Sequence, residues 1–112
     1  MDEFSARPRY IRIVDIKSIR SAIRSAAPEL RASGLAALYV FGSQARGDAR
    51  EDSDIDLAFD VDPACEKFSL LDQAAVMLLL EKRLGRKVDF LERSALHRDL
   101  RPRIEREMIR LL

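Results

Sequence analysis

Side chains alternate between apolar and mostly acidic along residues 54–61, and this alternation constrains the fold more than any other feature of the sequence. Successive residues of a β-strand point to opposite faces of a sheet, so a period of two predicts a strand. One face would carry Ile55, Leu57, Phe59 and Val61, and the other Asp54, Asp56, Ala58 and Asp60. Pro63 cannot donate to a sheet ladder and is expected to end the strand. We therefore expect a strand with one apolar face.

Other patterns predict helices and strands on both sides of this segment. Helical spacing of apolar residues starts at Asp15, the expected N-cap, and Pro28 is expected to break that helix or to begin a new one. The further expected elements are a buried strand over 36–41, a turn or short helix over 43–48, a helix over 68–84 ended by Gly85, a strand over 87–91, and an amphipathic helix from Leu96 to Met108. This order predicts an α/β (α+β) fold of two layers, with a small mixed β-sheet flanked by helices. Residues 1–14 show no clear period, so we expect an irregular arm (1–14) and a single domain (15–112).

The composition is typical of a small cytosolic protein. The longest apolar run, Ala74–Leu80, is far shorter than the roughly 20 residues of a membrane span. No secretion signal is recognised at the start of the sequence. Cys65 is the only cysteine and cannot form an internal disulfide. We therefore expect a cytoplasmic location and no contact with a membrane.

The acidic residues of the middle segment require an explanation. Residues 49–72 contain eight Asp or Glu and only two Lys or Arg, although the whole chain carries a net charge of +1. Asp54 and Asp56 would leave the same face of the strand, with Cα atoms about 6.5–7 Å apart. Asp89, alone among apolar neighbours on another expected strand, is a third candidate for the same place. Carboxylate oxygens gathered in this way suit a hard cation such as Mg²⁺ or Mn²⁺.

Two other interpretations of the acids compete with a cation site. A bare Asp-x-Asp pair is most often solvated or bonded to turn amides. A calcium loop of the EF-hand type is excluded, because Leu57 stands where the glycine is required and Pro63 where the bidentate glutamate belongs. No histidine or cysteine accompanies the acids, which disfavours zinc.

A glycine and a serine upstream favour the functional interpretation. Gly42-Ser43 follows the expected buried strand over 36–41. A glycine there lets another group approach the backbone, and the exposed amides with a hydroxyl would face outward as donors to an anion. Phosphate at those donors and a divalent metal at the acids are the two halves of a nucleoside triphosphate site.

These residues together resemble the signature of a known enzyme superfamily. Gly42-Ser43, ten intervening residues and Asp54-Ile55-Asp56 resemble the DNA polymerase β-like nucleotidyltransferases. The longer strings VFGSQARG (40–47) and DSDIDL (52–57) are similar to the minimal nucleotidyltransferase (MNT) branch of that superfamily, and Asp89 in GRKVDF (85–90) falls where the family has its third carboxylate. The resemblance covers about residues 34–112.

The resemblance implies a role for each residue. Asp54 and Asp56 would hold two divalent ions, Mg²⁺ or alternatively Mn²⁺, about 3.5–4 Å apart on the triphosphate of ATP. Asp89 would complete the site next to the attacking hydroxyl and help to deprotonate it. Ser43 and the Gly42 amide region would bind the β- and γ-phosphates, and Arg46 would contact phosphate or acceptor, although a solvated arginine is equally compatible with the sequence. The implied reaction transfers a nucleoside monophosphate and releases pyrophosphate.

The resemblance also implies a partner. MNT proteins typically pair with a helical HEPN-domain toxin, and their MntA-like members act as antitoxins by transferring AMP to a tyrosine of that toxin. The apolar helix over 68–84 and the apolar C-terminal end (Met108, Ile109, Leu111, Leu112) fit such a hetero-oligomer, while burial in the core explains them equally well. Nucleic-acid binding by the C-terminal arginines is disfavoured, because Glu105 and Glu107 interleave with them and no aromatic residues lie nearby.

Two alternatives to a protein adenylyltransferase remain open at this stage. The chain could neutralise its partner by binding alone, as a non-catalytic antitoxin, or it could modify a small molecule such as an aminoglycoside. The sequence fixes neither the nucleotide base nor the acceptor, the number of transfers or the oligomeric state.

Overall fold

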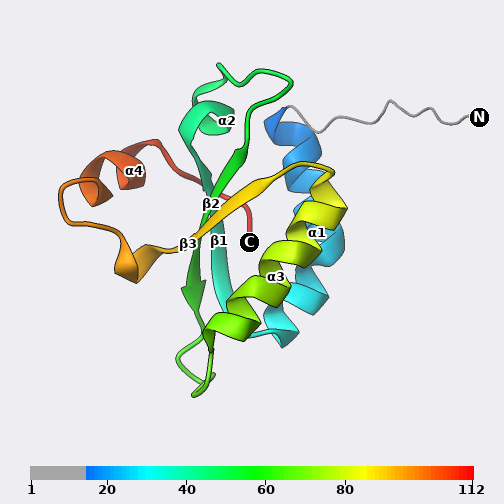
Figure 1. Ribbon diagram of the computed structural model, residues 1–112, viewed down its shortest axis with the longest axis vertical. Coiled ribbons are helices and arrows are strands. Elements are labelled where there is room, and N and C mark those ends of the chain that lie inside the picture. The colour runs from blue at the N-terminus through cyan, green and yellow to red at the C-terminus, as the bar shows by residue number, and fades with distance from the viewer. Residues whose placement is uncertain (1–14) are drawn as a thin grey trace, which may run out of the picture.

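The computed structural model describes residues 15–112, so the expected arm over 1–14 lies outside the described residues. The described elements, in chain order, are α1 (Ile16–Ala32), β1 (Leu35–Phe41), α2 (Gly42–Arg46), β2 (Ile55–Val61), α3 (Leu70–Leu84), β3 (Val88–Glu92), the 3₁₀ turn η1 (Arg93–Ala95), α4 (Arg101–Glu107) and β4 (Ile109–Arg110). Figure 1 shows them grouped around one twisted sheet.

The sheet is mixed, as the sequence predicts. Its strand order is β3-β2-β1-β4. β1 pairs antiparallel with both β2 and β4, whereas β2 and β3 are parallel. Parallel neighbours need a crossover connection, and α3 supplies it between β2 and β3. The α+β fold with a small mixed sheet and flanking helices is therefore confirmed.

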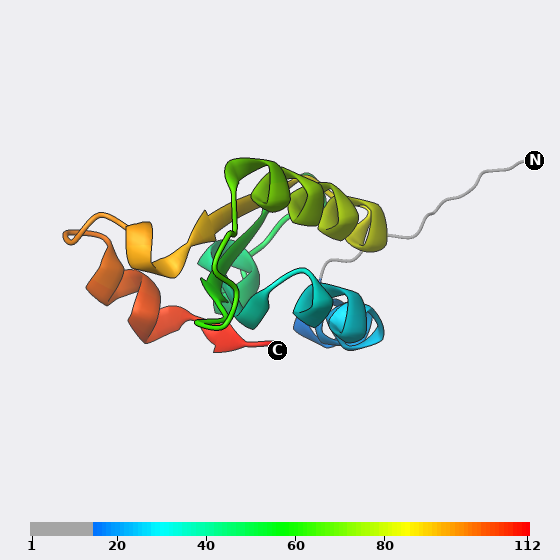
Figure 2. The ribbon, with the colours of Figure 1, turned by 90° about the horizontal axis from the view of Figure 1, so that it is seen from below.

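Helices lie on both faces of the sheet (Figures 1 and 2), and each face has its own core. α1 and α3 cover one face, which holds the main core with Ile55, Leu57 and Phe59 of β2. α4 lies on the other face, where Ile104 packs in a smaller cluster with Ala58 and residues of β1. The alternation along β2 therefore sorts its side chains as expected, and Asp54, Asp56 and Asp60 belong to the face of the smaller cluster.

The ends of the two long helices follow the sequence signals with one exception. The Asp15 carboxylate caps α1 by accepting from the Ser18 amide at 2.7 Å, and Gly85 ends α3 with a φ of +68°. The expected break at Pro28 is wrong, because α1 continues through it to Ala32. Pro28 and Arg24, whose carbonyl loses its donor, are both exposed, so water can replace the missing hydrogen bond.

The C-terminal segment also differs from the expectation. α4 is only seven residues long, so Leu96 lies outside it and Met108 is its C-cap. The chain then forms β4 against the free edge of β1, and the Leu111 amide donates to the Leu38 carbonyl at 2.7 Å. Ile109, Leu111 and Leu112 pack on the main core. These apolar residues thus complete the fold, which is the alternative of core burial, and they follow the helix as a short strand and the chain end.

Within residues 15–112, no helix combines the length and the apolar character that crossing a membrane requires.

Candidate active site

The pairing of β2 with β3 brings two of the predicted acids together. In the parallel register Asp56 lies opposite Asp89. Their strand neighbours, Ile55 and Leu57 on β2 and Val88 on β3, point into the main core, so both carboxylates project from the other face. Asp54 immediately precedes β2 and is exposed. The three acids therefore come from the starting ends of two neighbouring strands, β2 and β3.

The surroundings of the Asp56 carboxyl group disfavour its negative charge. Burial raises the pKa of its carboxyl to about 6, helped by a hydrogen bond with Asp89 and by the negative charges of Asp89 and Asp54. The charge of Arg46 acts in the opposite direction and lowers the pKa. Two facing carboxylates without a bound cation avoid repulsion by sharing a proton. The raised pKa of Asp56 is the sign of this repulsion.

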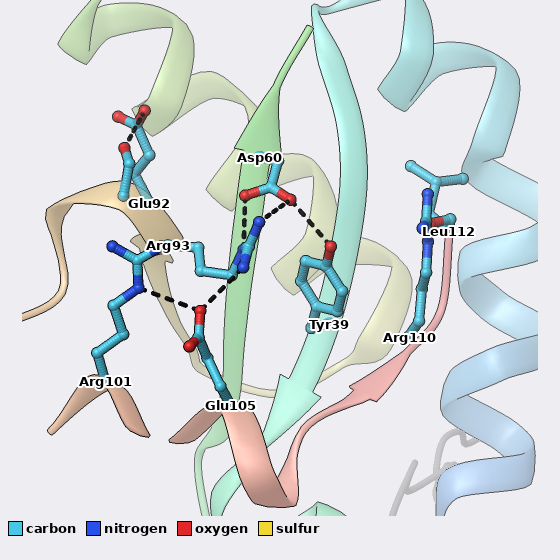
Figure 3. Close-up of polar contacts among 9 residues, drawn as sticks. Tyr39, Asp60, Glu92, Arg93, Arg101, Glu105, Arg110 and Leu112 are labelled. Atoms are coloured by element: carbon cyan, nitrogen blue, oxygen red, sulfur yellow. Dashed lines mark hydrogen bonds and ion pairs between the residues drawn. The ribbon is translucent and has the colours of Figure 1, made fainter. Parts of the chain in front are cut away.

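Asp60, on the same face of β2, is an acid whose charge is neutralised by an arginine. It accepts two hydrogen bonds from Arg93, at 2.9 and 3.1 Å, and a third from the Tyr39 hydroxyl at 2.9 Å (Figure 3). Burial alone would raise the pKa of Asp60, but these hydrogen bonds lower it below its ordinary value. Glu105 of α4 bonds both Arg93 and Arg101, which fastens α4 and η1 to the sheet. This network explains Asp60 structurally and leaves the Asp56–Asp89 pair unexplained by packing.

Gly42 allows the Asp56 carboxylate to lie against the backbone. α2 begins directly after β1, and Phe41 at the end of β1 pairs with Asp56. Gly42 has a φ of +72°, and a Cβ atom there would lie 2.2 Å from Oδ2 of Asp56. A side chain larger than hydrogen would have to displace that carboxylate. The glycine that the sequence singles out therefore has a steric reason next to the acid that it accompanies.

The Gly42 amide already has a carboxylate partner in the structure. It donates to Oε2 of Glu107, the last residue of α4, at 2.7 Å. Arg46 at the end of α2 donates to both oxygens of Glu107, at 3.3 and 3.4 Å, and pairs with Asp48 at 3.3 Å. Sequence reasoning missed Glu107. Its only visible feature in the sequence is that it is a glutamate among arginines, and such a pattern is common on solvated helix faces.

Ser43, Gly42 and Arg46 all lie at this end of the sheet, because α2 contacts β1, β2 and α4. Ser43 is half-buried, and its carbonyl accepts from the Gly47 and Asp48 amides at 2.9 and 3.0 Å, which closes α2. The structure thus places the residues of the first motif beside those of the second. The roles assigned to them remain predictions.

The donor set suits a divalent cation in its chemistry. Among residues 15–112, no three acidic, histidine or cysteine side chains are already assembled as a metal cluster. Asp56 and Asp89 nevertheless offer facing oxygen ligands, and Asp54 is close enough for its charge to raise the pKa of Asp56. Oxygen ligands without a neighbouring nitrogen or sulfur ligand are those that Mg²⁺ and Mn²⁺ prefer.

Comparison with known proteins finds relatives over most of the chain. The family model described as "Nucleotidyltransferase domain" matches residues 16–112. The protein adenylyltransferase MntA of Thermococcus cleftensis is 33% identical over 100 residues, which cover 87% of this chain and 96% of that protein. A candidate protein adenylyltransferase of Methanocaldococcus jannaschii is 35% identical over 95 residues, covering 85% and 99% of the two chains.

Solved structures extend the similarity to the fold. One described as a candidate minimal nucleotidyltransferase has a TM-score of 0.75 and 35% identity, covering 91% of this chain and 98% of the other. A second, of an MNT antitoxin with a tri-AMPylated HEPN toxin of Shewanella oneidensis, has a TM-score of 0.60 at 18% identity, covering 84% and 71%, and shows the fold alone. The resemblance noted in the sequence is therefore confirmed. This chain belongs to the nucleotidyltransferase domain family, in its minimal nucleotidyltransferase branch.

Proposed function

We propose that this protein is a Mg²⁺-dependent protein adenylyltransferase that transfers AMP from ATP to a tyrosine of a cognate HEPN-domain toxin, and so acts as its antitoxin. The observation that carries the proposal is the Asp56–Asp89 pair, which lacks a counter-charge of the kind that Asp60 has, beside a glycine that admits Asp56 to the backbone. Relatives named protein adenylyltransferase at 33–35% identity support the reaction class.

The residues divide the work as follows. Asp54, Asp56 and Asp89 would hold the cation, which would neutralise the triphosphate and orient it. Ser43 and Arg46 would bind the outer phosphates of ATP. The tyrosine oxygen attacks the α-phosphorus, a new P–O bond forms, the bond to the β-phosphate breaks, and pyrophosphate leaves with its electron pair. Asp89 accepts the hydroxyl proton. Positioning and charge neutralisation supply most of the catalysis in such transfers.

An apolar surface supports the partner. Leu70 and Leu71 at the start of α3 are each 82% exposed, and Leu78 is 60% exposed. Leu70 also lines a groove with Leu91, Leu96 and Leu100 at the outer edge of β3. Leu91 follows Asp89 by two residues on the same strand face, so one residue of the groove is a near neighbour of the candidate site. A protein bound in it would bring its hydroxyl groups close to Asp89.

The proposal is tested with the purified protein, labelled ATP, Mg²⁺ and the HEPN-domain protein encoded beside it. We expect label on the partner, and an increase in its intact mass of about 329 Da for each AMP. The Asp54→Asn/Asp56→Asn variant should lose transfer, whereas Asp62→Asn, an exposed acid just beyond β2, should retain it. Transfer that persists in the double variant would contradict the assignment. Neutralisation of the toxin without any added mass would show instead that binding alone is sufficient.

A further inference from the structure

Glu107 connects three parts of the site without belonging to any motif. It is the last residue of α4, and its side chain is only 17% exposed, compared with 47% for Arg46. One of its oxygens accepts from the Gly42 amide at 2.7 Å, and both accept from Nη1 of Arg46. A buried backbone amide needs an acceptor, and here a charged side chain from 65 residues away provides it.

The other glutamate of α4 has a different kind of contact. Glu105 pairs with Arg93 and Arg101, at 2.9 and 3.1 Å, and reaches neither the Gly42 turn nor Arg46. Two glutamates two residues apart on one short helix therefore serve two purposes. Glu105 fastens the helix to the sheet, whereas Glu107 is directed at the turn that carries Gly42.

From these contacts we infer that Glu107 is a positioning residue, which holds the Gly42 turn and Arg46 in the geometry that ATP requires. Gly42 in turn supports the Asp56 carboxylate, which lies directly against its Cα. Glu107 and Asp48 together use the Nη1 and Nε donors of Arg46, which leaves Nη2 for a phosphate. The inference rests on the proposed function. It also changes the role that the sequence predicted for the Gly42 amide. That amide donates to Glu107, so Ser43 and Arg46 are left to contact the phosphates.

The test compares steady-state transfer by three variants at a temperature well below the melting temperature of each. Glu107→Ala removes both contacts, and we expect the KM for ATP to rise about tenfold or more with a smaller fall in kcat, since a charge-assisted hydrogen bond is worth at least that factor. Glu107→Gln keeps an oxygen for the Gly42 amide but no charge for Arg46, and should fall between. Glu105→Ala should keep the wild-type KM for ATP, even if it melts at a lower temperature.

A purely structural role would give a different result. It predicts that Glu105→Ala and Glu107→Ala alter the KM in proportion to their loss of stability, and that outcome would overturn the inference. An unchanged KM in Glu107→Ala would overturn it as well.

Calorimetry of the non-hydrolysable analogue AMP-PNP with Mg²⁺ separates this inference from the proposed function. Weaker binding by Glu107→Ala than by Glu105→Ala supports the positioning role even if no acceptor protein is modified. Wild-type protein that binds the analogue but transfers nothing contradicts the proposed function alone. Equal affinity of Glu107→Ala and Glu105→Ala for AMP-PNP overturns the positioning role. A wild-type protein that does not bind AMP-PNP overturns it as well.

Discussion

At the scale of single residues, the informative comparison is between Asp56 and Asp60. Both lie on the same face of β2, yet the pKa of one is raised and that of the other lowered. Packing cannot account for the difference, because Asp60 shows that this face can supply an arginine and a tyrosine to an acid. A half-buried carboxylate that repels a neighbouring carboxylate is a cost to stability, which enzymes accept where the charge is used.

The first prediction concerns stability in the presence of a chelator. Asp56→Asn should raise the free energy of unfolding at pH 7.5 by about 1 kcal/mol, a figure that allows for solvent screening of this half-buried group. The pKa of Asp56 is about 6 in the folded protein, above its ordinary value of 3.8, so the folded state is favoured below pH 4 and loses that advantage as pH rises through 6. The difference between variant and wild type should therefore vanish near pH 4.

Urea denaturation at pH 4 and pH 7.5 measures this effect, and Asp60→Asn is the matched control. Asp60→Asn weakens the hydrogen bonds with Arg93, so it should lower the free energy of unfolding at pH 7.5, whereas Asp56→Asn should raise it. An Asp56→Asn protein that is less stable than wild type at pH 7.5 would contradict the electrostatic interpretation of the pair.

The second prediction compares two glycines with similar backbone angles. Gly42 and Gly47 have φ values of +72° and +82°, but only Gly42 has a close neighbour, Oδ2 of Asp56. Gly47→Ala should cost about 1–2 kcal/mol of backbone strain. Gly42→Ala should cost at least about 1 kcal/mol more, because the new methyl group displaces the carboxylate, and should abolish transfer. Thermal denaturation with transfer assays checks this, and equal losses of stability in the two variants would count against it.

At the scale of elements, local patterns predicted what local physics decides. The alternation along β2, the Asp15 cap and the Gly85 stop each depend on a few neighbouring residues, and all three are confirmed. Pro28 shows the limit of such reasoning. Its effect on α1 depends on whether the unpaired carbonyl of Arg24 faces solvent, which only the packed helix reveals.

Long-range contacts explain the elements that sequence reasoning missed. β4 is two residues long and exists because β1 has a free edge to pair with. Its residues carry no strand pattern of their own, and the four-residue spacing before them favoured a continued helix. Glu107 escaped notice for the same reason, since its partner Gly42 lies 65 residues earlier. The motif residues could be predicted from the sequence, whereas the residue that supports them could not.

The third prediction follows from β4. A chain that ends at Met108 should lose about 2–4 kcal/mol of stability, because it loses the amide bond to Leu38 and the packing of Ile109, Leu111 and Leu112. Arg110→Ala, which keeps the strand, should change stability by less than about 1 kcal/mol. Chemical denaturation of both proteins tests this prediction, and a truncated protein with the same free energy of unfolding as the wild type would refute it.

At the scale of the whole molecule, polar and apolar surfaces meet at the edge of β3. The acids of the candidate site lie on one face of β2 and β3, and the leucine-lined groove begins two residues after Asp89. Side chains of α3 already bond two backbone groups of this edge strand, since Gln73 donates to the Phe90 carbonyl and Glu81 accepts from the Val88 amide. A partner would therefore bind through apolar side chains in the groove rather than by adding a strand.

The fourth prediction tests this surface with Leu70→Asp. Leu70 is the first residue of α3, where a negative charge favours the helix, so the variant should be as stable as the wild type. Its affinity for the HEPN-domain partner should nevertheless fall at least about tenfold, because the charge enters an apolar contact. AMP-PNP binding should stay unchanged while the kcat/KM for the protein acceptor falls. Ser25→Asp, on the exposed side of α1, should affect neither quantity. Calorimetry of the complex measures the affinities, and wild-type affinity in Leu70→Asp would place the partner on another surface.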